Sequence, residues 1–181
     1  MNFQVQITGL EKTLQAIKTV KDEQLNVSTG RFRDLVARLM TEGYEIAQAG
    51  FANAQYAGEN DVVVAVPVWR GNTLVLSAHG NAVAFIEFGT GTFYQPYPDS
   101  EMASRAGVVP RGEYGKKKGR KPPWRYVGVA GNAGVVKHHK SDGTDVVETY
   151  GNPPARAMYE ASKVFNQDHV MEVAREVLRH D

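Results

Sequence analysis

The sequence predicts an α+β fold, in which an antiparallel β-sheet (a meander plus an extra hairpin) packs against a long helix from the N-terminal half and a C-terminal helix. Three observations predict this class. Apolar residues recur at helical spacing over about 30–55 and again after Pro154, and β-branched residues dominate 62–69. A chain of 181 residues can bury one core, so we expect a single domain over 1–181.

The N-terminal third is predicted to contain one strand and two helices. Apolar residues alternate with polar ones over 3–7, which is typical of a short half-buried strand. Over 10–20 the apolar residues fall at helical spacing and predict an amphipathic helix. The long helix at 30–55 contains Gly43 and Gly50, and glycine is unfavourable in a helix interior. These glycines predict a close contact with another helix or with the sheet.

A β-hairpin is predicted next. Its arms are 62–69 and 74–78, joined by the turn-forming residues 70–73. Pro67 has no amide hydrogen to donate, so it should lie at a sheet edge or a bulge. We expect 82–91 to add the third strand of the meander, because Phe85–Phe88 alternates aromatic with aliphatic or acidic side chains.

Glu87 is the one charged residue of that stretch, and Gly89-Thr90-Gly91 follows it closely. The glycines are expected to end the strand abruptly. We expect Glu87 to bind backbone amides or an arginine rather than to act as a general acid or base, because no second acid stands at a recognisable spacing. A small toxin or hydrolase acting through Glu87 is a weaker alternative.

Residues 92–150 are predicted to form a long excursion of loop and hairpin within the domain. No periodicity is visible over 92–123, whereas 124–129 has the composition of a strand. The segments 135–139 and 145–149 predict a hairpin around Asp142-Gly143. Pro153 and Pro154 are expected to start the final helix, with a break near Asn166 as an open alternative.

Composition and spacing exclude several kinds of site. Hydrophobic residues make up 42% and charged residues 23%, as in soluble globular proteins, and neither a membrane span nor a signal sequence is visible, which favours synthesis in the cytoplasm. The absence of cysteine excludes disulfides, thiolate metal sites and cysteine nucleophiles. None of the five histidines stands at zinc-ligand spacing. We therefore expect no catalytic residue, no metal and no cofactor, and no enzyme.

A basic loop interrupts an otherwise acidic chain. The net charge is +1, but 111–121 carries +5, which leaves −4 for the remainder. Clustered lysine and arginine can bind nucleic-acid phosphate, with Tyr114 and Trp124 available for base stacking. We favour the alternative of an acidic protein neighbour, because an oligomer of this chain offers acidic surfaces. The candidate contacts for a partner or DNA are Arg111, Lys116, Lys117, Lys118, Arg120, Lys121 and Trp124.

Two short motifs, Phe-Ile-Glu-Phe-Gly-Thr-Gly at 85–91 and Gly-Asn-Pro-Pro at 151–154, give the chain a family resemblance. With the helices around them, they resemble the tail-completion or neck (head–tail joining) proteins of long-tailed bacteriophages, often labelled tail components or minor structural proteins. The resemblance covers nearly the whole chain and is weakest over 94–147. At 155–157 the family usually has a second proline and a phenylalanine, which this chain lacks. The matching residues are Glu87, Phe88, Gly89, Thr90, Gly151, Pro153 and Pro154.

The resemblance implies a non-enzymatic structural protein of the virion, made in the host cytoplasm. Such proteins assemble as rings, typically six-fold, at the head–tail junction. They join the head connector or head-closure protein to the tail terminator or tail-tube protein around the DNA channel. DNA contact is therefore an implied property, and membrane contact is not. A nucleic-acid-binding module that uses the basic loop remains the alternative function.

Overall fold

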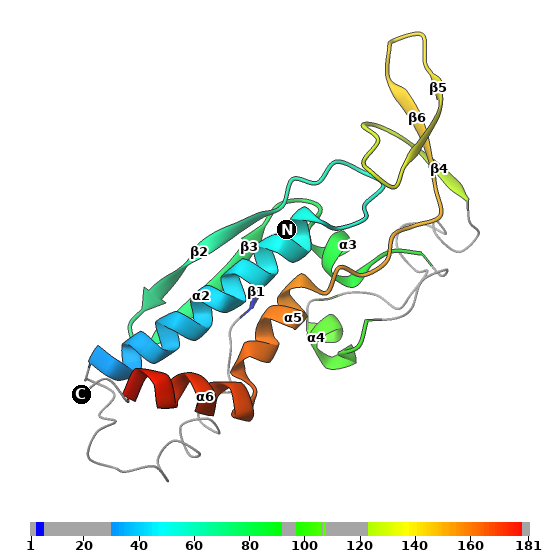
Figure 1. Ribbon diagram of the computed structural model, residues 1–181. Helices are drawn as coiled ribbons and strands as arrows, with labels where there is room; N and C mark the ends of the chain where they lie inside the picture. Colours follow the sequence, from blue (N-terminus) through cyan, green and yellow to red (C-terminus); the bar gives the residue numbers. More distant parts are fainter. Residues whose placement is uncertain (1–2, 6–29, 92–96, 106, 108–122, 179–181) are drawn as a thin grey trace. The chain divides into compact units, whose positions relative to one another are not determined.

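The computed structural model describes residues 3–5, 30–91, 97–105, 107 and 123–178 (Figure 1). Its helices and antiparallel sheets confirm the α+β class. The predicted helix at 10–20 lies outside the described residues. The described elements are β1 (Phe3–Val5), α2 (Gly30–Ala52), β2 (Val63–Arg70), β3 (Thr73–His79), α3 (Val83–Phe88), α4 (Ser100–Arg105), β4 (Trp124–Val127), β5 (Val135–His139), β6 (Asp145–Thr149), α5 (Ala157–Ser162), the 3-10 helix η1 (Lys163–Phe165) and α6 (Gln167–Leu178).

The chain divides into two compact units. Unit 1 consists of Met1–Phe3, Ala49–Val63 and Ala78–Ala157, and unit 2 consists of Gln4–Gln48, Val64–Ser77 and Met158–Asp181. Each unit is built from segments that are distant in sequence. The expectation of a single domain stays a prediction. None of the helices within the described ranges has both the length and the apolar composition needed to cross a membrane.

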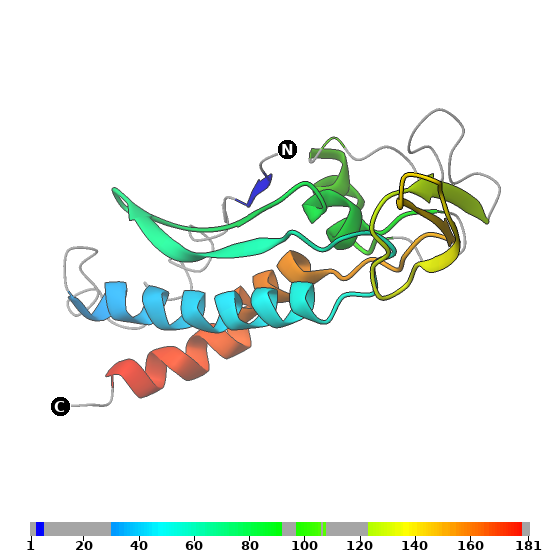
Figure 2. The same cartoon turned by 90° about the horizontal axis from the view of Figure 1, so that it is seen from above.

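The core of unit 2 lies between α2 and α6, which run alongside each other in Figure 2. Their contact is apolar, and a Cβ added at Gly43 of α2 would lie 3.3 Å from the carbonyl oxygen of Ala161 in α5. The predicted close helix contact at Gly43 is therefore confirmed. The cluster consists of Leu35 and Leu39 from α2 and Val170, Val173 and Ala174 from α6, with Phe165 and Val177 packed against it.

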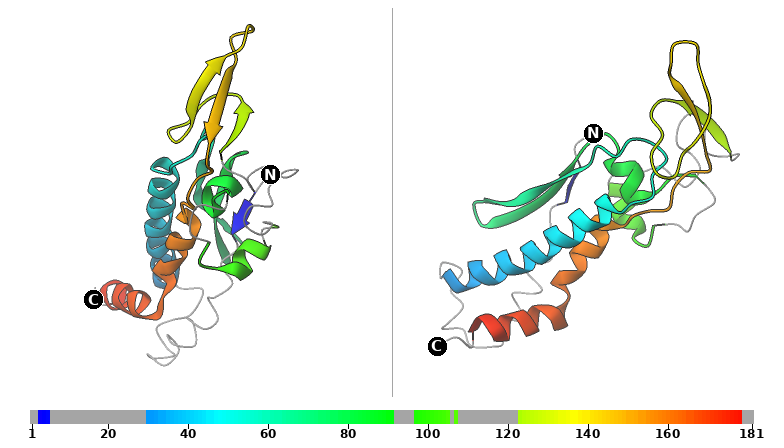
Figure 3. Two further views of the ribbon diagram at one scale, coloured as in Figure 1. Left: turned by 90° about the vertical axis from the view of Figure 1, so that its right-hand side faces the viewer. Right: turned by 45° about the horizontal axis from the view of Figure 1, so that its top comes forward.

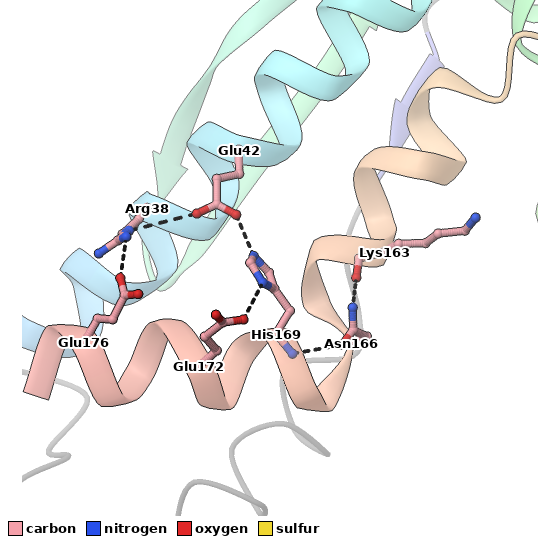
Figure 4. A network of polar contacts seen from close by, with 7 residues as sticks. All are labelled: Arg38, Glu42, Lys163, Asn166, His169, Glu172 and Glu176. Carbon is pink, nitrogen blue, oxygen red and sulfur yellow. Dashed lines mark hydrogen bonds and ion pairs between the residues drawn. The ribbon is translucent and has the colours of Figure 1, made fainter.

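Polar contacts flank this apolar seam (Figure 4). Arg38 pairs with Glu176 at 2.6 Å, and His169 Nε2 lies 2.6 Å from Glu42 Oε2. The side chains of Arg38 and Glu176 are about half exposed, at 49% and 52%, so this ion pair adds little to stability and the apolar seam dominates. Asn166 has extended backbone angles and its Oδ1 accepts the His169 amide at 3.0 Å, which caps α6. The break near Asn166 is thus confirmed.

The first sheet has the strand order β1-β3-β2. The hairpin β2–β3 forms as predicted, and Gly71 at its turn has φ 61°, which suits the first central position of a II′ turn. Pro67 lies on β2, the edge strand, as expected. The meander was wrong in its third strand, because β3 pairs with β1 instead of with 82–91.

Residues 83–88 form the helix α3, not a strand. Val83, Ile86 and Glu87 are spaced as neighbours on one helical face, and all three are almost fully buried. The alternation over Phe85–Phe88 covers four residues, which is too few to distinguish a strand from a helix. Asp61 also favours the helix, because its carboxylate accepts the amides of Asn81 and Ala82 at 2.8 Å each, where α3 begins.

The second sheet, in unit 1, has the order β4-β6-β5 (Figure 3). Both pairings are antiparallel, with Tyr126 opposite Val147 and a bulge between Val136 and His138. The predicted strand after 124 and the hairpin around Asp142-Gly143 are confirmed. On one face, Glu148 of the central strand pairs with Arg125 at 3.0 Å and with Lys137 at 2.9 Å. These hydrogen bonds and charges lower the pKa of Glu148, the bond from Lys137 being the largest cause.

Two further expectations were wrong, one about residues 92–123 and one about Pro153 and Pro154. Ser100–Arg105 form a short helix, α4, where no regular structure was predicted; Asp99 Oδ1 caps it by accepting the Met102 amide at 2.8 Å. Pro153 and Pro154 do not start the final helix, which begins at Ala157. Ala155 and Arg156, which lie between Pro154 and the start of that helix, donate their amides to carbonyl groups of α3.

Candidate assembly site

The two motifs, at 85–91 and 151–154 in the sequence, meet in unit 1. Thr90 and Asn152 form an antiparallel β-bridge, with N···O distances of 3.0 and 3.3 Å. The hydroxyl of Thr90 also donates to Asn152 Oδ1. In Figure 1, α3 and the segment that leads into α5 lie next to each other. We call residues 85–91 and 150–156 together the motif junction.

The motif junction satisfies the end of α3. The last four carbonyl groups of an α-helix have no partner within the helix, and a six-residue helix depends strongly on outside donors. Asn152 Nδ2 donates to the carbonyl of Phe85 at 2.9 Å. The amides of Ala155 and Arg156 donate to the carbonyls of Ile86 and Glu87 at 2.8 and 3.2 Å. The two prolines between these donors have no amide hydrogen, so the neighbouring residues supply the bonds.

Glycines allow the two segments of the motif junction to approach each other closely. Gly89 has φ 75°, and a Cβ there would lie 2.7 Å from the nitrogen of Pro154. Gly151 has φ 96°, and a Cβ there would lie 2.3 Å from the carbonyl oxygen of Thr90. Real Cβ atoms essentially never come so close to another atom, so a side chain at either position would force the two segments apart. The glycines of both motifs therefore serve the same close contact.

Glu87 is enclosed, with 0% of its surface exposed. The hydroxyl of Tyr97 donates to its Oε1 at 2.7 Å, and the ring of Tyr97 lies 4.6 Å from that of Phe88, centroid to centroid. The tyrosine is a partner that the sequence did not predict. A carboxylate enclosed in this way cannot touch a substrate in this conformation, which favours the structural interpretation of Glu87 over the catalytic one.

Asn152 is the residue that sequence reasoning missed. The sequence places it between Gly151 and Pro153 and indicates no role for it. The structure buries it to 1% exposure and gives its side chain partners on both motifs. A polar residue between glycine and proline in a short motif was the available signal, because such a side chain often bonds to nearby backbone.

Trp124 belongs to β4 and contacts the motif junction. Its Cη2 would lie 3.2 Å from a Cβ at Gly91 and 3.1 Å from a Cβ at Gly151. The indole is half-buried there, and base stacking by Trp124 stays a prediction. The six basic candidates of 111–121 lie outside the described residues.

Apolar side chains are exposed on strands of both units. On β2 of unit 2, Val66 and Val68 are 69% and 58% exposed and share one face of an edge strand. In unit 1, Val127 and Val135 are 51% and 57% exposed on the two outer strands of the second sheet. Exposed valines on sheet edges are typical of surfaces that bind another chain. Each unit therefore offers a separate candidate contact surface.

Ionisable groups elsewhere in unit 1 serve the fold. The amides of Asn81 and Ala82, in that order, hold the pKa of Asp61 below its ordinary value. Burial raises the pKa of Tyr126, whose hydroxyl donates to the carbonyl of Ala57. No group of three or more His, Asp or Glu side chains within the described ranges is arranged to hold a metal ion.

Comparisons with protein families, with curated protein sequences and with solved structures found no match to this chain.

Proposed function

We propose that this chain is a structural protein of the virion of a long-tailed bacteriophage, and that it acts at the head–tail junction as a tail-completion or neck protein. One observation carries the proposal. The two motifs on which the family resemblance rests form a single hydrogen-bonded junction in unit 1. Motifs that depend on each other's backbone are expected to occur together in a family, for structural reasons.

The groups of the motif junction support an architectural role. Glu87 and Asn152 are almost fully buried and bind neighbouring groups of the same unit. The motif junction also holds both ends of the excursion at 92–150, because Gly91 precedes this segment and Gly151 follows it. The β4-β6-β5 sheet therefore lies between two fixed ends of the chain, as a segment that binds another protein requires.

The exposed strands support assembly into a ring. A closed ring uses heterologous contacts, in which two different surfaces of each subunit meet. The valines of β2 in unit 2 and those of β4 and β5 in unit 1 are two such surfaces. We propose a homo-oligomeric ring, six-fold as the resemblance implies, between the head connector or head-closure protein and the tail terminator or tail-tube protein.

Depletion and complementation in a phage that encodes this chain test the proposal. Without the chain, we expect filled heads and free tails that fail to join. Wild-type chain supplied from a plasmid should restore infectious particles, and so should the matched control Asn53→Ala, which changes an exposed asparagine. Asn152→Ala, which removes the side chain shared by both motifs, should restore far fewer. Normal tailed particles in the absence of the chain would refute the proposal.

A further inference from the structure

The second sheet of unit 1 has two outer strands, β4 and β5, and they differ in how their edges are protected (Figure 3). Edge strands present unpaired backbone groups, which proteins commonly protect with lysine, proline or a β-bulge. β5 has two of these devices, because Lys137 lies in the bulge between Val136 and His138. β4 has none of the three, and its register with β6 is regular from Trp124 to Val127. The edge of β4 is therefore open to pairing.

Hydrogen bonding to β6 determines which backbone groups of β4 lie along this open edge. The amide of Gly128 donates to the carbonyl of Asp145 at 3.0 Å. Backbone groups in an antiparallel ladder point alternately toward the partner strand and away from it. Tyr126 therefore faces β6, as Gly128 does, whereas the N–H and C=O groups of Arg125 and Val127 point away from it. Within the described residues, no hydrogen bond is made to these four groups.

The side chains on one face of β4 hold the strand in place. Trp124 contacts the motif junction, and the hydroxyl of Tyr126 donates to the carbonyl of Ala57. Arg125 and Val127 lie on the opposite face and are exposed, Val127 to 51%. A strand that is already ordered loses little conformational freedom when another segment pairs with it, which favours binding.

We propose that an extended segment of a different protein pairs with the open edge of β4 and adds a fourth strand to this sheet. Main-chain hydrogen bonds to Arg125 and Val127 hold the segment, and side chains on the exposed face select it. The inference rests on the proposed function and deepens it, because it describes how unit 1 binds a neighbour at the head–tail junction.

Charge on the exposed face of the sheet defines the chemistry of the added segment. Arg125 Nε and Nη2 both bond to Oε2 of Glu148, at 3.1 and 3.0 Å, and Lys137 pairs with its Oε1 at 2.9 Å. Two cations thus share one carboxylate, so the three side chains together carry +1. Arg125 Nη1 makes no hydrogen bond to a described residue, and a further carboxylate beside it balances the charge. The segment therefore carries an acidic side chain beside Arg125 and, two residues along the same face, an apolar one beside Val127.

A second copy of this chain fits the edge of β4 poorly. Among the described strands, β1 has three residues, β5 is bulged, and β2 contains Pro67, which has no amide hydrogen to donate. Pairing of β4 with its own copy brings two Arg125 side chains onto one face and supplies no carboxylate. Such a pair is also two-fold, so it cannot continue around a ring. Val135 of β5 stays available for the contact between copies.

Amide exchange tests whether the edge is open. In the isolated chain, NMR should show the amides of Arg125 and Val127 exchanging on the order of tenfold or more faster than the amide of Tyr126, which faces β6. Equal protection of the three amides would mean that the chain covers this edge itself, and the inference would be wrong.

Photo-crosslinking in infected cells tests the occupant. Benzoylphenylalanine in place of Val127 should crosslink to a different protein, whereas the matched control position Val135, 57% exposed on β5, should not crosslink to that protein. Arg125→Gln should lower the yield on the order of tenfold, because it removes the cation beside the added carboxylate. Lys137→Gln removes the other cation from Glu148 and should leave the yield unchanged. A crosslink from position 127 to a second copy alone, no crosslink there, or equal losses in both variants would overturn the inference.

A proline at the edge connects the contact to head–tail joining. Val127→Pro removes an outward amide and no bond to β6, so it should melt close to the matched control Val127→Thr, which keeps that amide. In depleted phage, Val127→Thr should restore joined particles, and Val127→Pro should restore on the order of tenfold fewer. Val127→Lys, which protects the edge with a charge, is a second variant should the proline prevent folding. If both restore joining as Val127→Thr does, the inference is wrong while the proposed function stands. If joining needs no chain at all, the proposed function fails, and exchange and crosslinking still decide the inference.

Discussion

Removing the Tyr97 hydroxyl tests whether Glu87 holds the motif junction together. Tyr97→Phe keeps the ring against Phe88 but leaves the enclosed carboxylate without the donor that lies 2.7 Å from it. Leaving a buried hydrogen-bonding group without one of its partners costs about 1–3 kcal/mol. We therefore expect the free energy of unfolding to fall by about 2 kcal/mol in chemical denaturation. Tyr150→Phe is the matched control, because that side chain is 51% exposed, and it should change stability by less than about 0.5 kcal/mol.

A double-mutant cycle shows whether the loss belongs to this pair. Once Glu87→Leu has removed the acceptor, Tyr97→Phe should destabilise the protein much less than it does in the wild type. The expected coupling energy lies within the roughly 0.5–3 kcal/mol range found for residues in direct contact. If Tyr97→Phe has the small effect of Tyr150→Phe, or if the two changes are additive, Glu87 does not depend on Tyr97. The account of the junction would then be wrong.

Two further predictions concern Asp61 and the basic loop. Hydrogen bonds lower the folded-state pKa of Asp61 below its ordinary value of 3.8, so their stabilisation is present above that value and is lost as the pH falls through the lower folded pKa. Melting temperatures between about pH 6 and pH 2 should therefore fall less steeply for Asp61→Asn than for the wild type, and parallel curves would contradict this. Substituting alanine for all three of Lys116, Lys117 and Lys118 should reduce the salt dependence of DNA binding if the loop binds phosphate. Unchanged binding would remove the nucleic-acid alternative.

Long periodic segments made most of the fold predictable from sequence. The apolar stripe of α2 extends over many turns of the helix. The turns of the hairpins β2–β3 and β5–β6 contain Gly71 and Gly143, whose φ values of 61° and 81° favour glycine. The prediction of a strand at 82–91 failed because this segment is short. Val83, Ile86 and Glu87 fit one face of a helix as well as Phe85–Phe88 fits the alternation of a strand. Its helix depends on Asp61 and on the motif junction, which are distant in sequence.

The sequence predicted some residues of the site, but it predicted neither Asn152 and Tyr97 nor the contacts between the motifs. The sequence placed Gly89 and Gly151 in two short motifs, yet it could not show that each lies against the other's motif. The prolines at 153 and 154 suggested a helix start, because their φ suits one. The structure instead uses the amides that follow them to complete α3. Tyr97 was missed as the partner of Glu87 because nothing in their spacing marks the pair.

Locating the chain in assembled particles tests the central claim most directly. The chain, tagged so that complementation is retained, should appear by electron microscopy as one ring between head and tail in every tailed particle. Density or label elsewhere in the virion, or absence of the chain from joined particles, would contradict a role at the head–tail junction.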